Sequence, residues 1–222
     1  MNKLLNAANT AVPRNKILEA VDLAKKEFVV SIWRAANVEG LNTTFASTEA
    51  ILENLPVMTK RDEVLFVLNM RDAQRFLLDN LEYNNCWMLL REFNNVAGRD
   101  LVPAPGVLRR TEISMGGTTW KPDIPSEPDV YEKISDLNKI VDPVEKALEY
   151  YCYITRAQLF NDGNKRVAQL MTNKILIENG VGIFSIPVNE VNDFKMLLIE
   201  FYETADNTRL KNFLRDKCIH LV

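Results

Sequence analysis

The part of the sequence that decides the fold is Phe160-Asn161-Asp162-Gly163-Asn164-Lys165-Arg166, a polar run between two segments with helical patterning. Before it, Asp142-Pro143 is a good helix start, with Asp as the cap and Pro in the first turn, and apolar residues then recur at helical spacing as far as Gln158. After it, we expect a second helix over about 166–178, ending at Asn179-Gly180. The run is therefore predicted to connect two core helices.

The residues of this run suit a phosphate group. A helix N-terminus has free backbone N–H groups and a partial positive charge, and Gly163 lets the backbone approach a ligand closely. Lys165 and Arg166 add two cationic donors at the same end. Asp162 fits the same site if it holds a Mg²⁺ ion that bridges to the phosphates. Taken alone, Asp-Gly-Asn also fits an ordinary turn, so a polar turn without a ligand is the alternative.

Apolar residues at three- and four-residue spacing predict further helices over about 15–34, 45–55, 61–81, 87–96, 189–203 and 206–219. The segment 98–130 differs, because it holds five of the nine prolines and four of the eight glycines, which disfavours a helix. Within it, Thr111–Met115 alternates polar and apolar residues, and Gly116-Gly117 and Thr118–Trp120 follow. This pattern predicts a short β-hairpin on an otherwise helical body.

The run Ala157–Arg166 resembles the signature of Fic/Doc proteins, whose usual form is His-Pro-Phe-x-Asp-Gly-Asn-Gly/Lys-Arg. Pro105–Gly117, followed by Pro122 and Pro125, is similar to the flap region of that family, and Asn37–Thr44 is similar to the N-terminal inhibitory stretch of one Fic class. The three matches occur in the right order. The resemblance implies a mostly α fold, a Fic-type helical bundle with a small β-hairpin flap.

The resemblance also implies an activity, because Fic-type enzymes commonly transfer AMP from ATP to a hydroxyl side chain of a target protein. It places Asp162 at the Mg²⁺ position. It places the phosphate-binding residues at Gly163, Asn164, Lys165 and Arg166. It places the flap residues, where a target segment would dock by strand addition, at Ile113, Ser114 and Met115. ATP or another nucleotide and a protein target of unknown identity are therefore the expected partners.

The departures from the family pattern bear on activity. Gln158 occupies the position of the catalytic histidine, the general base, and a glutamine amide cannot accept that proton. Lys165 replaces the glycine of the common AMP-transferring form and resembles the Doc-type variant, which transfers the terminal phosphate of ATP. Gln169 stands where a second arginine usually pairs with the inhibitory glutamate, so Glu39 would lack its usual partner. An ordinary helix-terminal acid is the alternative interpretation of Glu39.

Two functions are compatible with this sequence. One is an AMP- or phosphotransferase that is impaired or altered by Gln158; the other is a catalytically inactive Fic-fold regulator or protein-binding module. The sequence leaves open whether the chain is an enzyme, which base the nucleotide carries and whether the chain forms a homo-oligomer. Near the loop, Tyr151 is expected to pack in the core rather than stack on a base, and Cys152 to be a buried thiol rather than a nucleophile.

The composition of the chain limits its domain organisation and the classes of function it can have. With 222 residues, of which 47% are hydrophobic and 26% charged, the chain is expected to form one Fic/Doc-like domain over 1–222. We divide it into N-terminal helices with the inhibitory segment (1–56) and a Fic core (57–222). A net charge of −3 argues against nucleic-acid binding through a basic face. No membrane span and no signal peptide are recognised, so we expect a cytoplasmic protein.

Overall fold

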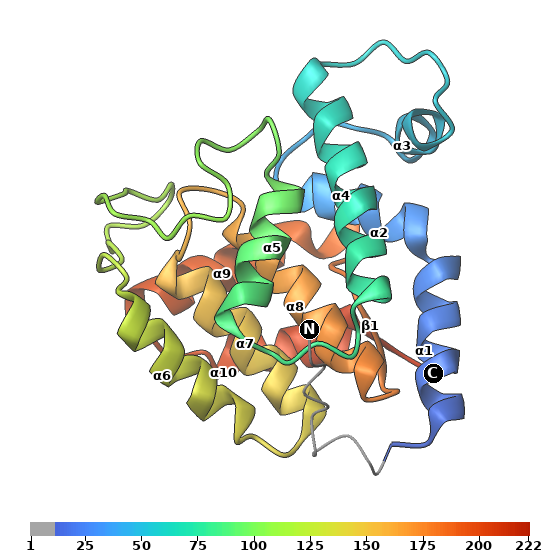
Figure 1. Cartoon of the computed structure of the whole chain (residues 1–222). Helices are drawn as coiled ribbons and strands as arrows, with labels where there is room; N and C mark the ends of the chain where they lie inside the picture. Colours follow the sequence, from blue (N-terminus) through green and yellow to red (C-terminus); the bar gives the residue numbers. More distant parts are fainter. Residues whose placement is uncertain (1–11) are drawn as a thin grey trace.

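Helix α8 (Asn164–Glu178) lies at the centre of the computed structural model, which describes residues 12–222 (Figure 1). All of its side chains are buried except those of Lys165 and Asn173, which are partly exposed. A helix without a solvated face must be enclosed by other elements. Those elements are α1 (Arg14–Lys26), α4 (Arg61–Asp79), α5 (Trp87–Ala97), α7 (Pro143–Ala157) and β1 (Gly182–Phe184).

The other elements of the described residues form an outer layer: α2 (Phe28–Val38), α3 (Phe45–Leu52), α6 (Glu127–Asn138), the short 3-10 helix η2 (Val188–Glu190), α9 (Val191–Thr204), α10 (Thr208–Cys218) and β2 (Ile219–Leu221). The predicted mostly α-helical fold class is confirmed. Helix α7 begins as the sequence predicted, since the Asp142 side chain accepts a hydrogen bond from the backbone N–H of Glu145 at 2.6 Å.

The only strand pair among residues 12–222 lies where the sequence analysis expected no strand. β1 and β2 are antiparallel, with Ile183 opposite His220. A Cβ atom at Gly182 would come within 2.0 Å of the His220 carbonyl oxygen, so this position requires glycine. The pair fastens the C-terminal segment beside α8. The helix predicted over 206–219 consequently ends one residue early, at Cys218.

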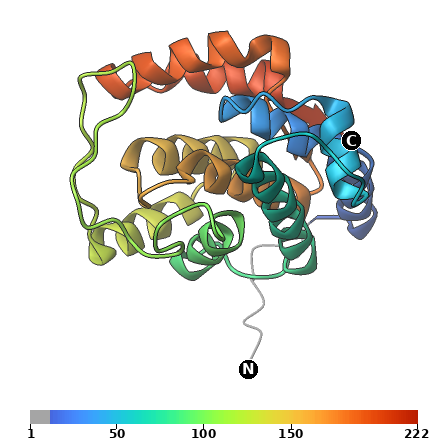
Figure 2. The same cartoon turned by 90° about the horizontal axis from the view of Figure 1, so that it is seen from above.

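The strand pairing predicted for Thr111–Met115 and Thr118–Trp120 does not form, because neither segment is a strand. The chain does reverse at Gly116-Gly117, where Gly117 has a φ of +81°. Figure 2 shows this part of the chain as an extended loop along one side of the bundle. We call the stretch 107–125 the flap segment; its backbone reverses direction without the ladder of hydrogen bonds that would make it a hairpin.

Helix α9 holds the flap segment in place of a partner strand. The Glu203 carboxylate accepts a hydrogen bond from the backbone N–H of Thr119 at 2.7 Å. Trp120 stacks on Tyr202 with ring centroids 5.5 Å apart, and the Arg156 guanidinium lies 4.5 Å from the Trp120 ring centre. Contacts of side chains with α9 thus replace the strand pairing expected from the sequence.

Two helix predictions need correction. The helix expected over 15–34 is two helices, α1 and α2, that meet at Glu27. The chain changes direction there because α1 packs against β1 and α8, whereas α2 packs against α3 and α4. Helix α6 begins inside the stretch 98–130 that was expected to lack helix. Ser126 caps it by accepting a hydrogen bond from the backbone N–H of Asp129 at 3.3 Å.

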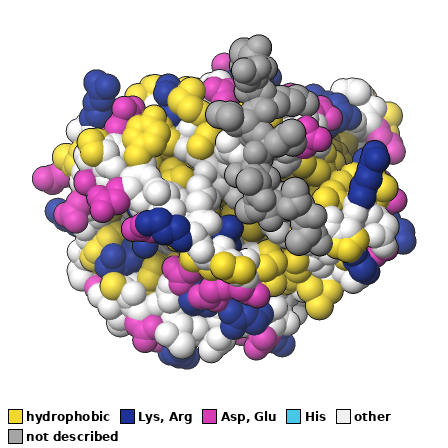
Figure 3. All heavy atoms as spheres, turned by 60° about the horizontal axis from the view of Figure 1, so that its bottom comes forward, with side chains coloured by type: hydrophobic (Ala, Val, Ile, Leu, Met, Phe, Trp, Pro, Cys, Tyr) yellow, Lys and Arg dark blue, Asp and Glu magenta, His cyan; other side chains and the backbone are white. Residues whose placement is uncertain are grey.

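On the face shown in Figure 3, acidic and basic side chains lie interspersed among hydrophobic ones. Within residues 12–222, no helix has the length and apolar character needed to cross a bilayer.

Candidate functional site

The loop between α7 and α8 is shaped by two residues in the left-handed region. Gln158, which ends α7, has a φ of +49°, and Gly163, which precedes α8, has a φ of +81°. A Cβ atom on Gly163 would meet the Asn94 side-chain nitrogen at 2.9 Å, so glycine is needed both for its conformation and for its lack of a side chain. Phe160 anchors the loop: it is fully buried and stacks on Trp87.

The buried side chain of Asn164 holds the loop through hydrogen bonds to Phe160 and Gln158. Its oxygen accepts from the backbone N–H of Phe160 at 3.0 Å, and its nitrogen donates to the Phe160 carbonyl at 2.8 Å and to Gln158 Oε1 at 2.9 Å. Because this amide is engaged on both sides, the side chain of Asn164 has a structural role. The phosphate role predicted for Asn164 would fall to its backbone N–H, which helix geometry leaves without an intrahelical acceptor.

Gln158 is also held by several hydrogen bonds. Its Nε2 donates to the Thr155 carbonyl at 2.6 Å, its Oε1 accepts from Asn164, and its backbone carbonyl accepts from Arg109 Nε at 2.8 Å. The side chain lies beside Tyr202, whose pKa is raised by burial. The position resembling that of the catalytic histidine is thus occupied by a neutral amide with a fixed orientation.

Charged side chains gather on the opposite side of the loop. The Asp162 carboxylate accepts from the backbone N–H of Gly163 at 2.6 Å and from Arg166 Nη2 at 2.9 Å, while its side chain stays 60% exposed. Arg166 is 5% exposed and also donates to the Ala97 carbonyl at 2.8 Å. Its Nε is buried and has no hydrogen-bond partner within residues 12–222. Part of the donor capacity of Arg166 is therefore unused.

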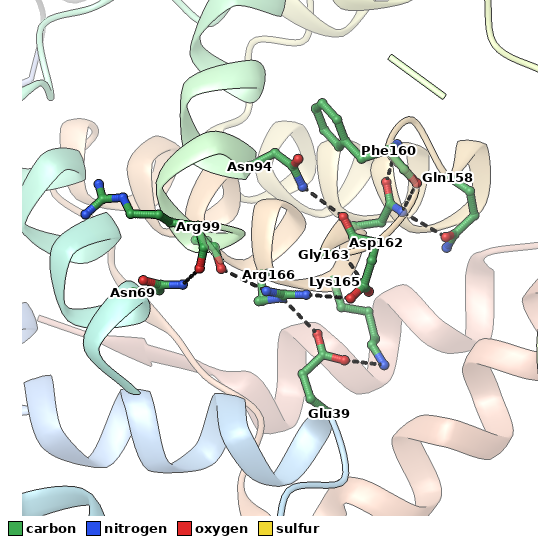
Figure 4. A network of polar contacts seen from close by, with 12 residues as sticks. Glu39, Asn69, Asn94, Arg99, Gln158, Phe160, Asp162, Gly163, Lys165 and Arg166 are labelled. Carbon is green, nitrogen blue, oxygen red and sulfur yellow. Dashed lines mark hydrogen bonds and ion pairs between the residues drawn. The ribbon is translucent and has the colours of Figure 1, made fainter. Parts of the chain in front are cut away.

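Glu39 reaches this charged group from the end of α2. One of its oxygens lies 2.8 Å from Lys165 Nζ, and the other lies 3.7 Å from Arg166 Nε (Figure 4). The sequence analysis expected Glu39 to lack its usual partner, because position 169 is a glutamine. Gln169 is indeed buried away from this network, with an unpaired Nε2. Glu39 nevertheless has a partner in the site, and that partner is Lys165.

A pocket of about 330 Å³ opens between the loop, the flap segment and α9. From the predicted residues it brings together Glu39, Met115, Gln158, Asp162, Asn164 and Lys165. Four other predicted residues are not part of its lining: Gly163, Arg166, Ile113 and Ser114. The flap segment therefore closes one side of the pocket through Met115 and Gly116, and α9 closes another.

Three residues of this region were missed by the sequence analysis. Lys195, on α9, lines the pocket. Asn94, on α5, donates to the Asp162 carbonyl at 2.9 Å and accepts from the backbone N–H of Gly106 at 2.8 Å. Arg109 is fully buried. An amide on the otherwise apolar face of α5 was a usable signal for Asn94, but no local pattern marks the other two.

Arg109 joins the flap segment to the end of α7. Its guanidinium donates to the carbonyls of Gln158, Thr111 and Asp123, and its backbone N–H donates to the Leu159 carbonyl at 2.8 Å. The pKa of Arg109 is lowered by burial, although the nearby Asp123 carboxylate opposes this effect. The two ends of the flap segment and the loop are consequently fixed to one side chain.

The comparisons with known proteins agree with this geometry. A model of the Fic/DOC family matches residues 88–176, from α5 to α8. Residues 88–176 of this chain therefore resemble the Fic/DOC family. Protein adenylyltransferase fic-1 of Caenorhabditis elegans is 24% identical over 184 residues, which cover 75% of this chain and 35% of that protein. The chain thus spans about a third of the length of this relative and is related to AMP-transferring enzymes.

Solved structures show the same fold. A structure of Fic-1 from C. elegans superposes with a TM-score of 0.69 at 21% identity, over 93% of this chain and 63% of that one. A structure of IbpAFic2 covalently tethered to Cdc42 superposes with a TM-score of 0.51 at 17% identity, over 95% and 72% of the two chains. The predicted Fic-type bundle is confirmed by these superpositions.

Two other predictions concern residues near the loop. Cys152 is buried, and burial together with the nearby Glu149 carboxylate raises the pKa of its thiol to about 12, so the thiolate needed for nucleophilic chemistry is scarce. Tyr151 is buried in the core against Phe184, as predicted. The single histidine, His220, lies in β2 with its Nε2 3.1 Å from Arg34 and is not part of the pocket.

Proposed function

We propose that this protein binds a nucleoside triphosphate with Mg²⁺ in the pocket between the loop, the flap segment and α9. One observation carries the proposal: Lys165 and Asp162 line a single pocket at the N-terminus of α8, and Arg166 pairs with Asp162 there. The free backbone N–H groups of the first turn would receive an inner phosphate, and the two cations would neutralise it. Apolar side chains of Leu198 and Met115 offer a surface for the base.

The residues present fit a magnesium ion that arrives with the nucleotide. Mg²⁺ takes one or two carboxylates together with phosphate oxygens and water. Asp162 is more than half exposed and lies at the pocket, beside Asn161. When bound, the ion would supply positive charge to the phosphate oxygens. The contribution of the chain itself is to orient the Asp162 carboxylate through Gly163 and Arg166.

The transfer chemistry of the relatives would be impaired or altered here. A reaction on a protein hydroxyl needs a base for the hydroxyl proton, and Gln158 has no such capacity. Loss of a general base typically costs about 10²–10⁴-fold in rate. The protein would therefore transfer AMP or phosphate slowly, or bind nucleotide without turnover. The target segment would dock along the flap segment, at Ile113, Ser114 and Met115, by adding a strand to an exposed backbone edge.

The ion pair of Glu39 bears equally on both candidates, the impaired transferase and the inactive regulator or binding module. The carboxylate of Glu39 already forms an ion pair with Lys165, the residue that would bind a phosphate. Nucleotide entry then requires the carboxylate to leave, so Glu39 acts as an inhibitory group in both candidates. In this chain the inhibitory contact is made with Lys165.

The first experiment is calorimetric titration of ATP, with and without Mg²⁺, into the native protein and into Asp162→Ala. We expect Mg²⁺-dependent binding that is lost in the variant. Asp216→Ala removes an exposed carboxylate outside this pocket and serves as the matched control, with unchanged binding expected. Absence of binding at millimolar ATP in both the native protein and Glu39→Ala would refute the proposal.

A second experiment separates the two candidates. Gln158→His is incubated with Mg²⁺ and ATP labelled at the α- or the γ-phosphate, and label incorporated into protein is measured. Incorporation of the α label shows AMP transfer, and incorporation of the γ label shows phosphate transfer. Either result, if absent from the double variant with Asp162→Ala, supports a transferase site that lacks only its base. No incorporation despite ATP binding favours the regulator.

A further inference from the structure

The charged side chains that line the pocket, counted together with Arg166, which pairs with Asp162, do not balance. The carboxylates of Glu39 and Asp162 pair with Lys165 and Arg166 at 2.8 and 2.9 Å, so these two negative and two positive charges offset one another. Lys195 also lines the pocket. Within residues 12–222 its ammonium group has no hydrogen bond and no ion pair. One positive charge at the pocket is therefore left without a counter-charge, and it will attract an anion.

The position of Lys195 along α9 gives its place in the pocket. Lys195, Leu198, Ile199 and Tyr202 follow one another at helical spacing and form one face of α9. Tyr202 lies beside Gln158. A helix rises 1.5 Å per residue, so Lys195 lies roughly 10 Å farther along α9 than Tyr202. The pocket thus has the neutral Gln158 amide near one end of this face and a free ammonium group at the other.

The 3-10 helix before α9 indicates that the Lys195 end of α9 lies near α2. The 3-10 helix η2, directly before α9, packs against α2, and Glu39 follows the last residue of α2. Glu39 and Lys195 both line the pocket. Two cations, Lys165 and Lys195, therefore reach the pocket from different elements, and only Lys165 is neutralised.

We infer that Lys195 binds the outer phosphates of a nucleoside triphosphate and makes the pocket distinguish triphosphates from monophosphates. This inference rests on the proposed function. An inner phosphate at the N-terminus of α8 leaves the outer phosphates to be neutralised elsewhere. Lys165 can contribute only once Glu39 has been displaced, whereas Lys195 is available without breaking any contact. A lysine suits this position because its flexible stem carries a compact charge.

The test is calorimetric titration of ATP, ADP and AMP, each with Mg²⁺, into the native protein, Lys195→Ala and Lys133→Ala. Lys133 is exposed on α6, outside this pocket, so its removal changes the net charge equally. We expect Lys195→Ala to weaken ATP binding about tenfold, as for the loss of one charge-assisted contact, ADP binding less, and AMP binding not at all. Lys133→Ala should bind all three like the native protein. The series is repeated in the Glu39→Ala background, which frees Lys165.

The outcomes separate this inference from the proposed function. If the native protein binds ATP and Lys195→Ala binds it equally well, the role of Lys195 is refuted and the nucleotide site stands. If Lys195→Ala weakens AMP as much as ATP, the assignment to the outer phosphates is refuted. If neither the native protein nor Glu39→Ala binds ATP, the role of Lys195 and the proposed function are both refuted. Lys195→Arg, which keeps the charge, should retain the preference for ATP. Thermal unfolding of the Lys195 variants should match that of the native protein, because Lys195 makes no hydrogen bond and no ion pair within residues 12–222.

Discussion

The loop between α7 and α8 has two sides that differ in kind. On the inner side, Gln158, Phe160 and Asn164 are buried and their polar groups are satisfied by one another. On the outer side, Asp162 and Lys165 are partly exposed and are held by ion pairs that a ligand can replace. We call the inner side the scaffold, because its hydrogen bonds fix the shape of the loop. We call the outer side the charge network, because a ligand can replace its ion pairs.

The largest effect is expected from Arg166→Ala, because Arg166 belongs to both sides. It donates to the buried Ala97 carbonyl and also holds the Asp162 carboxylate. We expect ATP affinity to fall about 100-fold, from loss of charge-assisted contacts. The free energy of unfolding should fall by about 2 kcal/mol, because a buried acceptor is left unpaired.

Calorimetry and urea unfolding measure the two effects of Arg166→Ala. Arg166→Lys is the matched control: it keeps the charge without the planar donor geometry, so its affinity should lie between those of the native protein and Arg166→Ala. Native ATP affinity in a folded Arg166→Ala variant would contradict the assignment of Arg166 to the charge network.

Asn164→Ala should break the scaffold alone. The buried N–H of Phe160 and the Oε1 of Gln158 would lose their partner, which typically costs about 2–3 kcal/mol of unfolding free energy. Urea unfolding measures this loss, with the exposed Asn189→Ala as control. ATP affinity of the folded variant should change less than it does in Arg166→Ala. The reverse order of affinity losses would show that the two sides of the loop cannot be separated.

The sequence predicted the scaffold side well because its determinants are local. The Asp142 cap, the helical spacing that leads to Gln158, and Gly163 at the turn are all encoded within a short stretch. Helix α6 was missed although Ser126 and Asp129 form a recognisable cap, because the prolines nearby outweighed that signal.

The charge network could be predicted only in part, because half of it comes from distant elements. Lys165 and Arg166 were found next to the glycine turn, but the ion pair of Lys165 with Glu39 joins α8 to α2. Lys195 belongs to a third helix. The sequence next to each of these residues does not indicate which helices will pack together in the fold. Likewise, the alternating pattern of Thr111–Met115 could not show that α9 would hold the flap segment in place of a partner strand.

Glu39→Gln should shift the charge network without disturbing the scaffold. The variant keeps the shape of the side chain but removes the negative charge that occupies Lys165. We expect ATP affinity to rise by up to about tenfold, which corresponds to about 1.4 kcal/mol. The rise should diminish at high salt, because screening weakens partly exposed ion pairs. Calorimetry at low and high salt measures it, and unchanged or weaker ATP binding at low salt would show that Glu39 is an ordinary helix-terminal acid.

The smallest effect concerns the side of the pocket formed by the flap segment, where Glu203 accepts from Thr118 and Thr119. These hydrogen bonds, first the one from the Thr118 hydroxyl and then the one from the Thr119 backbone, lower the pKa of Glu203 below its ordinary value of 4.5. A carboxylate with a lowered pKa stabilises the folded contact above its ordinary pKa, and the contact is lost as pH falls through the lowered value. Hydrogen exchange of the Thr119 amide should therefore be slower than in Glu203→Gln at pH 6, and this difference should vanish once the pH falls below the lowered pKa of Glu203. If the two proteins exchange this amide equally at pH 6, the carboxylate does not hold the flap segment, and stacking of Trp120 on Tyr202 alone keeps that side of the pocket closed.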